Sequence, residues 1–156
     1  ASTQAMSEFV NQWVGGMERL RWAHMEKPLR AAQGSKAPEY PRSASQSTLA
    51  AWAATWQGLR SVTVQSASAA ASAPGSALVP LATYLRGKGQ NLLADKLQHA
   101  VQKVDASMAQ VQRAGVRGKA AIQQAARDLA ALKFLAESEV APALQVSIGF
   151  SDADGD

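Results

Sequence analysis

The residues of this sequence that could do metal or acid-base chemistry are few. Cysteine is absent, which excludes disulfides, thiolate metal sites and cysteine nucleophiles. The two histidines, His24 and His99, fall in segments with helical periodicity, where a zinc site needs a second ligand three or four residues away. Glu26 lies two residues from His24, and Asp95, four residues before His99, is interpreted only as its hydrogen-bond partner. We therefore expect both histidines to be surface or partly buried side chains.

The acidic end of the chain is the other candidate for chemistry. The stretch VSIGFSDADGD places Asp152, Asp154 and Asp156 at alternate positions around Gly155. A calcium loop of the EF-hand type needs Asp-x-Asp-x-Asp-Gly and a glutamate at its twelfth position, and this stretch has neither. The aspartates therefore do not make a calcium loop by themselves, but they remain candidates for a composite site that other residues complete.

Aromatic residues offer a further choice between a pocket and a core. The four tryptophans are Trp13, Trp22, Trp52 and Trp56. They could form the floor of a ligand pocket, but tryptophans at helical spacing are more often core residues, and Trp52 and Trp56 lie four residues apart on one predicted helix face. We favour the core interpretation.

Composition indicates the class of protein that must position these residues. The chain has 156 residues, 47% hydrophobic and 18% charged, which is typical of one soluble globular domain. No apolar run approaches the roughly 20 residues of a transmembrane helix. The net charge of +4 comes from scattered residues without a basic and aromatic cluster, so no nucleic-acid partner is expected. The first residues lack a secretory signal, which we expect either to have been removed or never to have existed.

Periodicity predicts an all-α protein, an up-and-down four-helix bundle with one long loop and an irregular acidic C-terminal tail. The helices are predicted over residues 5–29, about 47–64, 78–111 with an interruption at Gly87 and Gly89, and 119–140. Residues 31–46 form the long loop, and residues 65–77 form a flexible connector. The predicted core consists of Met6, Phe9, Val10, Trp13, Val14, Met17, Leu20, Leu49, Trp52, Ala53, Trp56, Leu59, Leu93, Leu97, Val101, Val104, Met108, Val111, Ile122, Leu129, Leu132, Leu135 and Val140.

Two local patterns leave alternatives open. Gly15 and Gly16 interrupt the first helix and indicate either a kink or a close approach of another backbone. The heptad-like seam from Leu97 to Val111 could pack within the chain or against a helix of another chain.

Several stretches resemble the imelysin family of bacterial proteins. VAPALQVSIGFSDADGD is similar to the end of imelysin chains, where a hydrophobic-Gly-Phe segment precedes Asp-Gly-Asp; the matching residues are Glu139, Ala141, Pro142, Leu144, Gly149, Phe150, Asp154, Gly155 and Asp156. RWAHMEKPLRAA, RSASQSTLAAWAATWQGLR and LATYLRGKGQNLLADKLQHAV are similar to the helices and the Arg-Ser-rich loop that precede this end. The resemblance spans nearly the whole chain, and the tail is its most specific part.

The resemblance implies that residues 1–156 are a single helical bundle corresponding to the C-terminal half of an imelysin-like protein. The family's Gly-x-His-x-x-Glu motif lies in the other half, and neither His24 nor His99 has its Gly and Glu neighbours. The peptidase or metal site proposed for the family is therefore not carried over, and we expect no proteolysis from this chain alone. The expected partner is the N-terminal imelysin half or a partner chain.

The resemblance also implies a bacterial periplasmic or cell-envelope protein linked to iron uptake, which contributes to a metal, haem or partner-binding site. Iron or another divalent metal is the cofactor implied for the full-length protein, and its identity stays open. The acidic tail is expected to fold back toward the cleft between the halves and meet the polar loop, because carboxylates and an arginine attract each other. The candidate ligand or partner-binding residues are Arg42, Ser43, Ser45, Asp152, Asp154 and Asp156.

Two other functions compete with this one. The first is an inactive part of a metallopeptidase-like protein, although the chain has no histidine-carboxylate zinc motif, nucleophile elbow or phosphate loop. The second is a helical protein-interaction module without a small-molecule ligand, in which the tryptophans belong to the core and the aspartates cap backbone amides.

Overall fold

The described part of the chain consists of helices joined by short turns. The computed structural model describes residues 3–26, 28, 45–64 and 79–145, and these contain no strand. The elements are α1 (Thr3–Glu18), the π-helix η1 (Arg19–Glu26), α3 (Ser45–Thr63), α4 (Leu81–Gly87), α5 (Asn91–Ala114), α6 (Lys119–Leu135), the π-helix η2 (Ala136–Val140) and α7 (Ala141–Ala143). The prediction of an all-α fold is confirmed.

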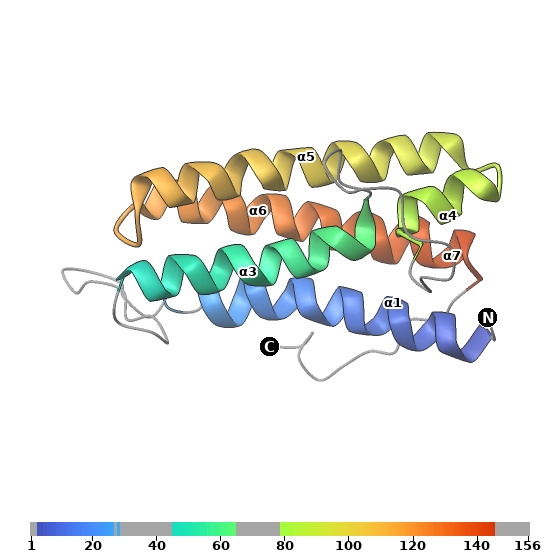
Figure 1. Cartoon of the computed structure of the whole chain (residues 1–156), viewed down its shortest axis with the longest axis horizontal. Coiled ribbons are helices and arrows are strands. Elements are labelled where there is room, and N and C mark those ends of the chain that lie inside the picture. Colours follow the sequence, from blue (N-terminus) through green and yellow to red (C-terminus); the bar gives the residue numbers. More distant parts are fainter. Residues whose placement is uncertain (1–2, 27, 29–44, 65–78, 146–156) are drawn as a thin grey trace.

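The long helices lie side by side along one axis (Figure 1). α5 and α6 form the most extensive contact and are joined by a short turn, where α5 ends before Gly115 at a φ of 79°. α6 also packs against α1 and η1, and α3 packs against α5 and η1. The short helix α4 packs on α5 and is a separate piece, so the structure has more helical elements than the four predicted segments.

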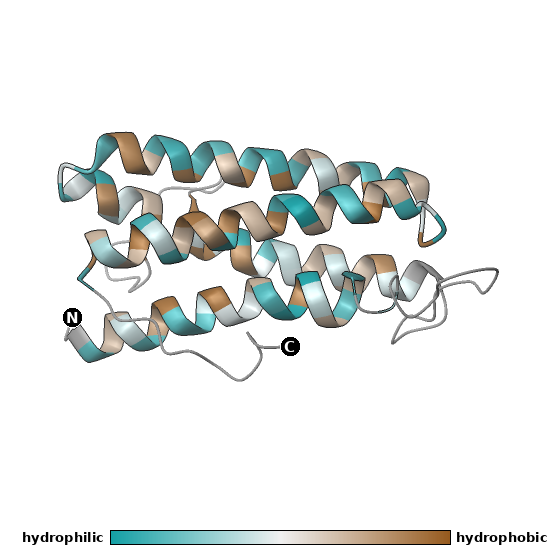
Figure 2. Ribbon diagram, turned by 180° about the vertical axis from the view of Figure 1, so that it is seen from behind, coloured by the Kyte–Doolittle hydropathy of each residue, from teal (hydrophilic) through white to brown (hydrophobic). Residues whose placement is uncertain are grey.

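The core lies along the facing sides of these helices, where hydrophobic residues are concentrated (Figure 2). Most of the predicted core residues are buried, and five of them are partly buried and pack against the core: Met6, Phe9, Leu49, Leu59 and Leu135. The prediction is wrong for Ala53, which is half-buried and does not belong to this core. The seam on α5 is buried against the chain's own helices, with Leu97, Val104 and Val111 at 0% exposure. Burial of each such side chain stabilises the fold by roughly 1.5–3 kcal/mol, and the seam is therefore used within the chain.

The core interpretation is confirmed for three tryptophans: Trp13, Trp52 and Trp56 are no more than 3% exposed. Trp13 Nε1 donates a hydrogen bond to Thr63 Oγ1 at 2.8 Å, which joins α1 to the end of α3. Trp56 Nε1 donates to Asp105 Oδ1 at 2.8 Å, which joins α3 to α5. Buried indole N–H groups need such acceptors, so each bond fixes the position of one helix on another.

Gly16 explains how closely α1 approaches α3. A Cβ atom at this position would lie 2.7 Å from Leu59 Cδ2, closer than side chains normally come. The neighbour at Gly16 is thus the side chain of Leu59, which would have to shift to admit a methyl group, and the predicted close approach of another backbone is not found there. At Gly15 a Cβ atom would meet only Arg19 Nη1, at an ordinary 3.5 Å.

Candidate functional site

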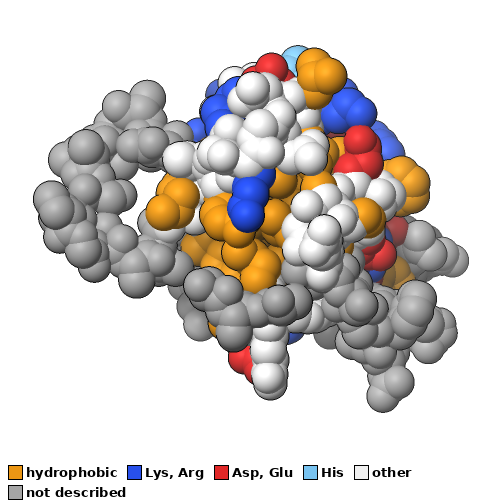
Figure 3. Space-filling model, turned by 90° about the vertical axis from the view of Figure 1, so that its right-hand side faces the viewer, with side chains coloured by type: hydrophobic (Ala, Val, Ile, Leu, Met, Phe, Trp, Pro, Cys, Tyr) orange, Lys and Arg blue, Asp and Glu red, His pale blue; other side chains and the backbone are white. Residues whose placement is uncertain are grey.

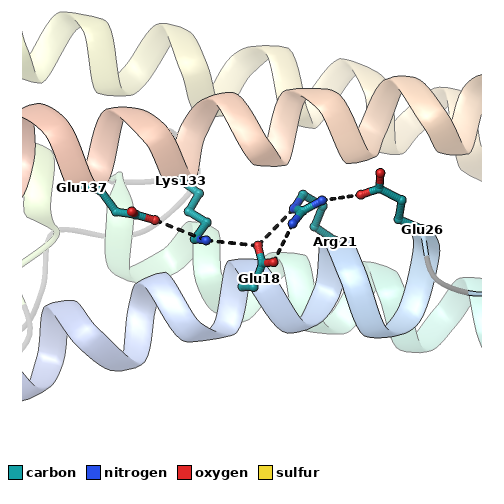
Figure 4. A network of polar contacts seen from close by, with 5 residues as sticks. All are labelled: Glu18, Arg21, Glu26, Lys133 and Glu137. Atoms are coloured by element: carbon teal, nitrogen blue, oxygen red, sulfur yellow. Dashed lines mark hydrogen bonds and ion pairs between the residues drawn. The ribbon is translucent and has the colours of Figure 1, made fainter. Parts of the chain in front are cut away.

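A network of charged side chains joins α1 and η1 to α6 and η2 (Figure 4). Glu18, the final residue of α1, receives hydrogen bonds from Arg21, with Arg21 Nε 3.0 Å from Glu18 Oε2. Lys133 of α6 lies with Nζ 3.4 Å from Glu18 Oε2 and 3.3 Å from Glu137 Oε1. Arg21 also pairs with Glu26. Glu18 is only 7% exposed, so its charge depends on these partners.

The π-helical stretches make this network possible. Arg21 and Glu26 are five residues apart, and side chains at that separation do not meet on an α-helix, where neighbours are three or four residues apart. A π-helix closes its turns between residues five apart, so η1 brings Arg21 and Glu26 to the same side. π-Helical turns are rare in proteins and occur frequently at functional sites. Here η1 begins directly after Glu18, and Glu137 is the second residue of η2.

The surroundings of Arg21 act on its pKa in opposite directions. Burial has the largest single effect and lowers the pKa of the guanidinium, but the hydrogen bonds and charges of Glu18 and Glu26 together outweigh it and raise the pKa above its ordinary value. Arg21 also lies over the half-buried ring of Trp22, with its Cζ atom 6.0 Å from the ring centroid. The guanidinium is therefore a permanent cation that holds the carboxylates in place.

The charges of the network are satisfied by one another. Three carboxylates surround two cations, and all five side chains take part in the contacts drawn in Figure 4. Such an arrangement suits a clamp between α1–η1 and α6–η2 better than a reactive site, because neither cation is left free for a ligand. We interpret the network as the element that fixes α6–η2 relative to the rest of the bundle.

A groove lies on the other side of α6, between α5 and the helices α6, η2 and α7. This groove has a volume of about 890 Å³. Its apolar residues include Leu92, Leu93, Ala100, Ala131, Leu135 and Ala143, and its ionisable residues are Asp95, Lys96, His99, Lys103, Asp128 and Glu139. We call this set of residues the α5–α6 groove. The clamp described above therefore positions one of its two walls.

One end of the α5–α6 groove opens at the end of the bundle that carries α4 and α7. Leu92, at the start of α5, and Ala143, in α7, contribute to the groove there. Seen from this end, hydrophobic side chains gather on the surface between polar and charged ones (Figure 3). Leu92 is 82% exposed, so a large apolar side chain stands in solvent at the entrance.

A smaller hollow lies between α3 and α5. It has a volume of about 430 Å³ and is lined in part by Trp56, Arg60 and Asp105. Asp105 accepts hydrogen bonds from the ring nitrogen of Trp56 and from Arg60 Nε, the latter at 2.9 Å to Oδ2. These polar groups are occupied with one another, so this hollow offers a ligand less than the larger groove does.

The predicted site residues fall at or beyond the edges of the described structure. Ser45 is the first residue of α3. Arg42, Ser43, Asp152, Asp154 and Asp156 lie outside the described residues, as do the predicted long loop, connector and acidic tail. The meeting of tail and loop therefore stays a prediction.

The expected environments of the two histidines are confirmed, but the expected partner of one is wrong. His24 is half-buried in η1 and His99 is exposed on α5. Asp95 does not bond to His99, because its Oδ1 atom accepts a hydrogen bond from Arg86 Nη2 at 2.6 Å, which joins α5 to α4. Within residues 3–145, as far as they are described, no group of three or more His, Asp or Glu side chains could hold a metal ion.

Sequence reasoning missed both the network and the groove. Glu18 with Arg21, and Lys133 with Glu137, have the spacing of helical ion pairs, so those two contacts could have been found. The link from Lys133 to Glu18 joins residues far apart in the chain and has no local signal. The groove likewise arises only when α5 and α6 are placed together.

Comparisons with known proteins found no relative of this chain. No family model, no curated protein and no solved structure matches this chain. Among the helices described, none is both long and apolar enough to span a membrane. The resemblance to imelysins stays a prediction.

Proposed function

We propose that this chain is a helical interaction module that binds a helical segment of a partner protein in the α5–α6 groove. The observation that carries the proposal is the groove itself, an open hollow of about 890 Å³ running between two long helices with an apolar floor. Binding of an amphipathic helix between two helices is a common mode of peptide recognition.

The apolar side chains that line the two walls support this proposal. Leu92 lines the groove from α5 and is 82% exposed. From α6, the partly buried Leu135 lines the opposite wall. An exposed apolar side chain that continues the apolar lining of a groove enlarges the surface that a partner can cover.

A blocking substitution tests the proposal. Ala131→Gln places a long side chain in the groove, and Ala120→Gln makes the same change on an exposed part of α6 away from it. The probe is a fluorescent amphipathic helical peptide of about 15 residues, long enough to span the groove. We expect Ala131→Gln to weaken binding at least about tenfold and Ala120→Gln to leave it unchanged. Equal binding by both variants, or no binding by the unmodified chain, would contradict the proposal.

A second candidate function follows from the resemblance to imelysins. In this proposal the chain is the C-terminal bundle of an imelysin-like protein of the bacterial periplasm or cell envelope, linked to iron uptake. The groove would receive the N-terminal half or a partner chain. The sequence pattern of the tail supports it, and Asp152, Asp154 and Asp156 would supply carboxylate ligands to a metal, haem or partner site together with Arg42, Ser43 and Ser45.

Metal titration tests this second candidate. Calorimetric titration of the whole chain with Fe²⁺ or Mn²⁺ would be compared with the double variant Asp154→Asn and Asp156→Asn. Binding that the double variant loses would support the metal site. Absence of binding, or equal binding by both proteins, would contradict a metal site in this chain.

A further inference from the structure

The charges that line the α5–α6 groove are unevenly satisfied. Its carboxylates all have partners: Asp95 bonds to Arg86, and Glu139 Oε1 lies 2.9 Å from Lys96 Nζ. Asp128 accepts hydrogen bonds from Ser107 and, at 3.1 Å, from Gln124 Nε2. The negative charges are therefore already neutralised or hydrogen-bonded by the chain itself.

Two donors in the same groove have no such partner. Over the part of the chain that the structure describes, the side chains of His99 and Lys103 make no hydrogen bond and no ion pair, and both residues are exposed. They lie four residues apart on α5 and so occupy the same side of that helix, one turn from each other. The Lys103 ammonium, with three N–H donors, and the His99 imidazole, with at least one, can therefore donate hydrogen bonds to a ligand in the groove.

The apolar and basic parts of the groove follow each other along α5. Leu92 marks the apolar end, and Lys103 lies eleven residues further on, about 16 Å along the helix axis. That distance corresponds to about three turns of an α-helix. An occupant that satisfies both parts needs an apolar stripe at one end and carboxylates at the other.

We propose that the partner segment is an acidic amphipathic helix, whose apolar stripe contacts Leu92 and Leu135 and whose Asp or Glu side chains pair with Lys103 and His99. This inference rests on the proposed function of the groove and adds the chemistry of its occupant. A basic or neutral helix would leave Lys103 unpaired on binding, and that cost makes the groove selective.

Two synthetic helical peptides of about 15 residues distinguish the outcomes. They share one apolar stripe and differ only in carrying Glu or Lys at the positions that flank its end. With the whole chain we expect the Glu peptide to bind at least about tenfold more tightly than the Lys peptide, and added salt to reduce the difference. In Lys103→Glu the preference should reverse. The matched control Lys119→Glu, on the exposed start of α6 and outside the groove, should keep the original preference.

Each other outcome overturns the inference in a recognisable way. Equal binding of the two peptides, sensitive to Ala131→Gln, would leave the docking groove standing and contradict its acidic partner. No binding of either peptide would contradict the proposed function as well. Dimerisation that Ala131→Gln abolishes would make a second copy the occupant. Glu-peptide binding that appears only after Asp152, Asp154 and Asp156 are changed to Asn would make the chain's own acidic tail the occupant.

Discussion

Glu18 Oε2 lies 3.4 Å from Lys133 Nζ, and this contact joins the end of α1 to α6 across the bundle. Glu18 is 7% exposed and also receives two hydrogen bonds from Arg21, so one carboxylate connects the first and last helical rods. The position of α6, and with it one wall of the α5–α6 groove, depends on this connection.

Removing the charge of Glu18 should therefore destabilise the fold. Glu18→Gln leaves Arg21 and Lys133 with less negative charge in a largely buried setting, and we expect a loss of about 2 kcal/mol in the free energy of unfolding. Urea denaturation measures it. Asp95→Asn is the matched control, because its ion pair with Arg86 is exposed and should contribute no more than about 0.5 kcal/mol. If both variants lost the same unfolding free energy, the network would not act as a clamp between the helices.

Gly16→Ala should destabilise the fold, whereas Gly58→Ala should stabilise it. In Gly16→Ala the new methyl group meets Leu59 Cδ2 at 2.7 Å, so α1 and α3 must move apart or Leu59 must change rotamer. Gly58 lies in α3, and a methyl group added there would have nothing within 4 Å of it. We expect Gly58→Ala to raise the free energy of unfolding by up to about 1 kcal/mol. Thermal unfolding of both variants should show Gly16→Ala below the parent chain and Gly58→Ala above it.

The hydrogen bond between Trp56 and Asp105 should matter more than the ion pair beside it. Asp105→Ala leaves the buried Trp56 N–H without its acceptor, which should cost about 1–3 kcal/mol. Arg60→Met removes the ion pair and keeps the indole bond, and should cost less than about 1 kcal/mol because the pair is partly exposed. Urea denaturation followed by tryptophan fluorescence measures both. The reverse order would contradict this assignment.

Leu92 should be dispensable for folding and important for binding. Its side chain is 82% exposed, so Leu92→Ser should change the free energy of unfolding by no more than about 0.5 kcal/mol. The same substitution removes an apolar contact at the entrance of the groove and should lower the binding affinity of the amphipathic peptide several-fold. Val79→Ser is a control at another exposed hydrophobic residue, outside the groove lining. A large loss of stability in Leu92→Ser would show that the residue belongs to the fold.

Much of the fold could be predicted because its helices obey a period of 3.6 residues. The start of α6 at Lys119 and the end of α5 near Gly115 were both marked in the sequence, by a glycine-rich turn between two apolar patterns. The buried seam of α5 followed from the same pattern. Where Gly87 and Gly89 interrupt the third segment, the chain forms two helices instead of one.

The candidate site could not be predicted in the same way. A π-helix does not follow the α-helical period, so the pairing of Arg21 with Glu26 had no visible signal. Lys96, His99 and Lys103 look like an ordinary solvated helix face until α6 is placed beside them. The residues favoured from sequence, Arg42, Ser43 and the three aspartates of the tail, lie outside the described residues, and Ser45 begins α3.

Binding of a partner helix in the α5–α6 groove can be observed residue by residue, by mapping amide chemical shifts of the isotope-labelled whole chain during titration with the Glu peptide. We predict that the largest shift changes fall on α5 around Leu92–Lys103 and on the α6–η2–α7 rod around Asp128–Ala143. Changes concentrated on the hollow around Trp56 and Asp105, or no changes at saturating peptide, would contradict binding in this groove.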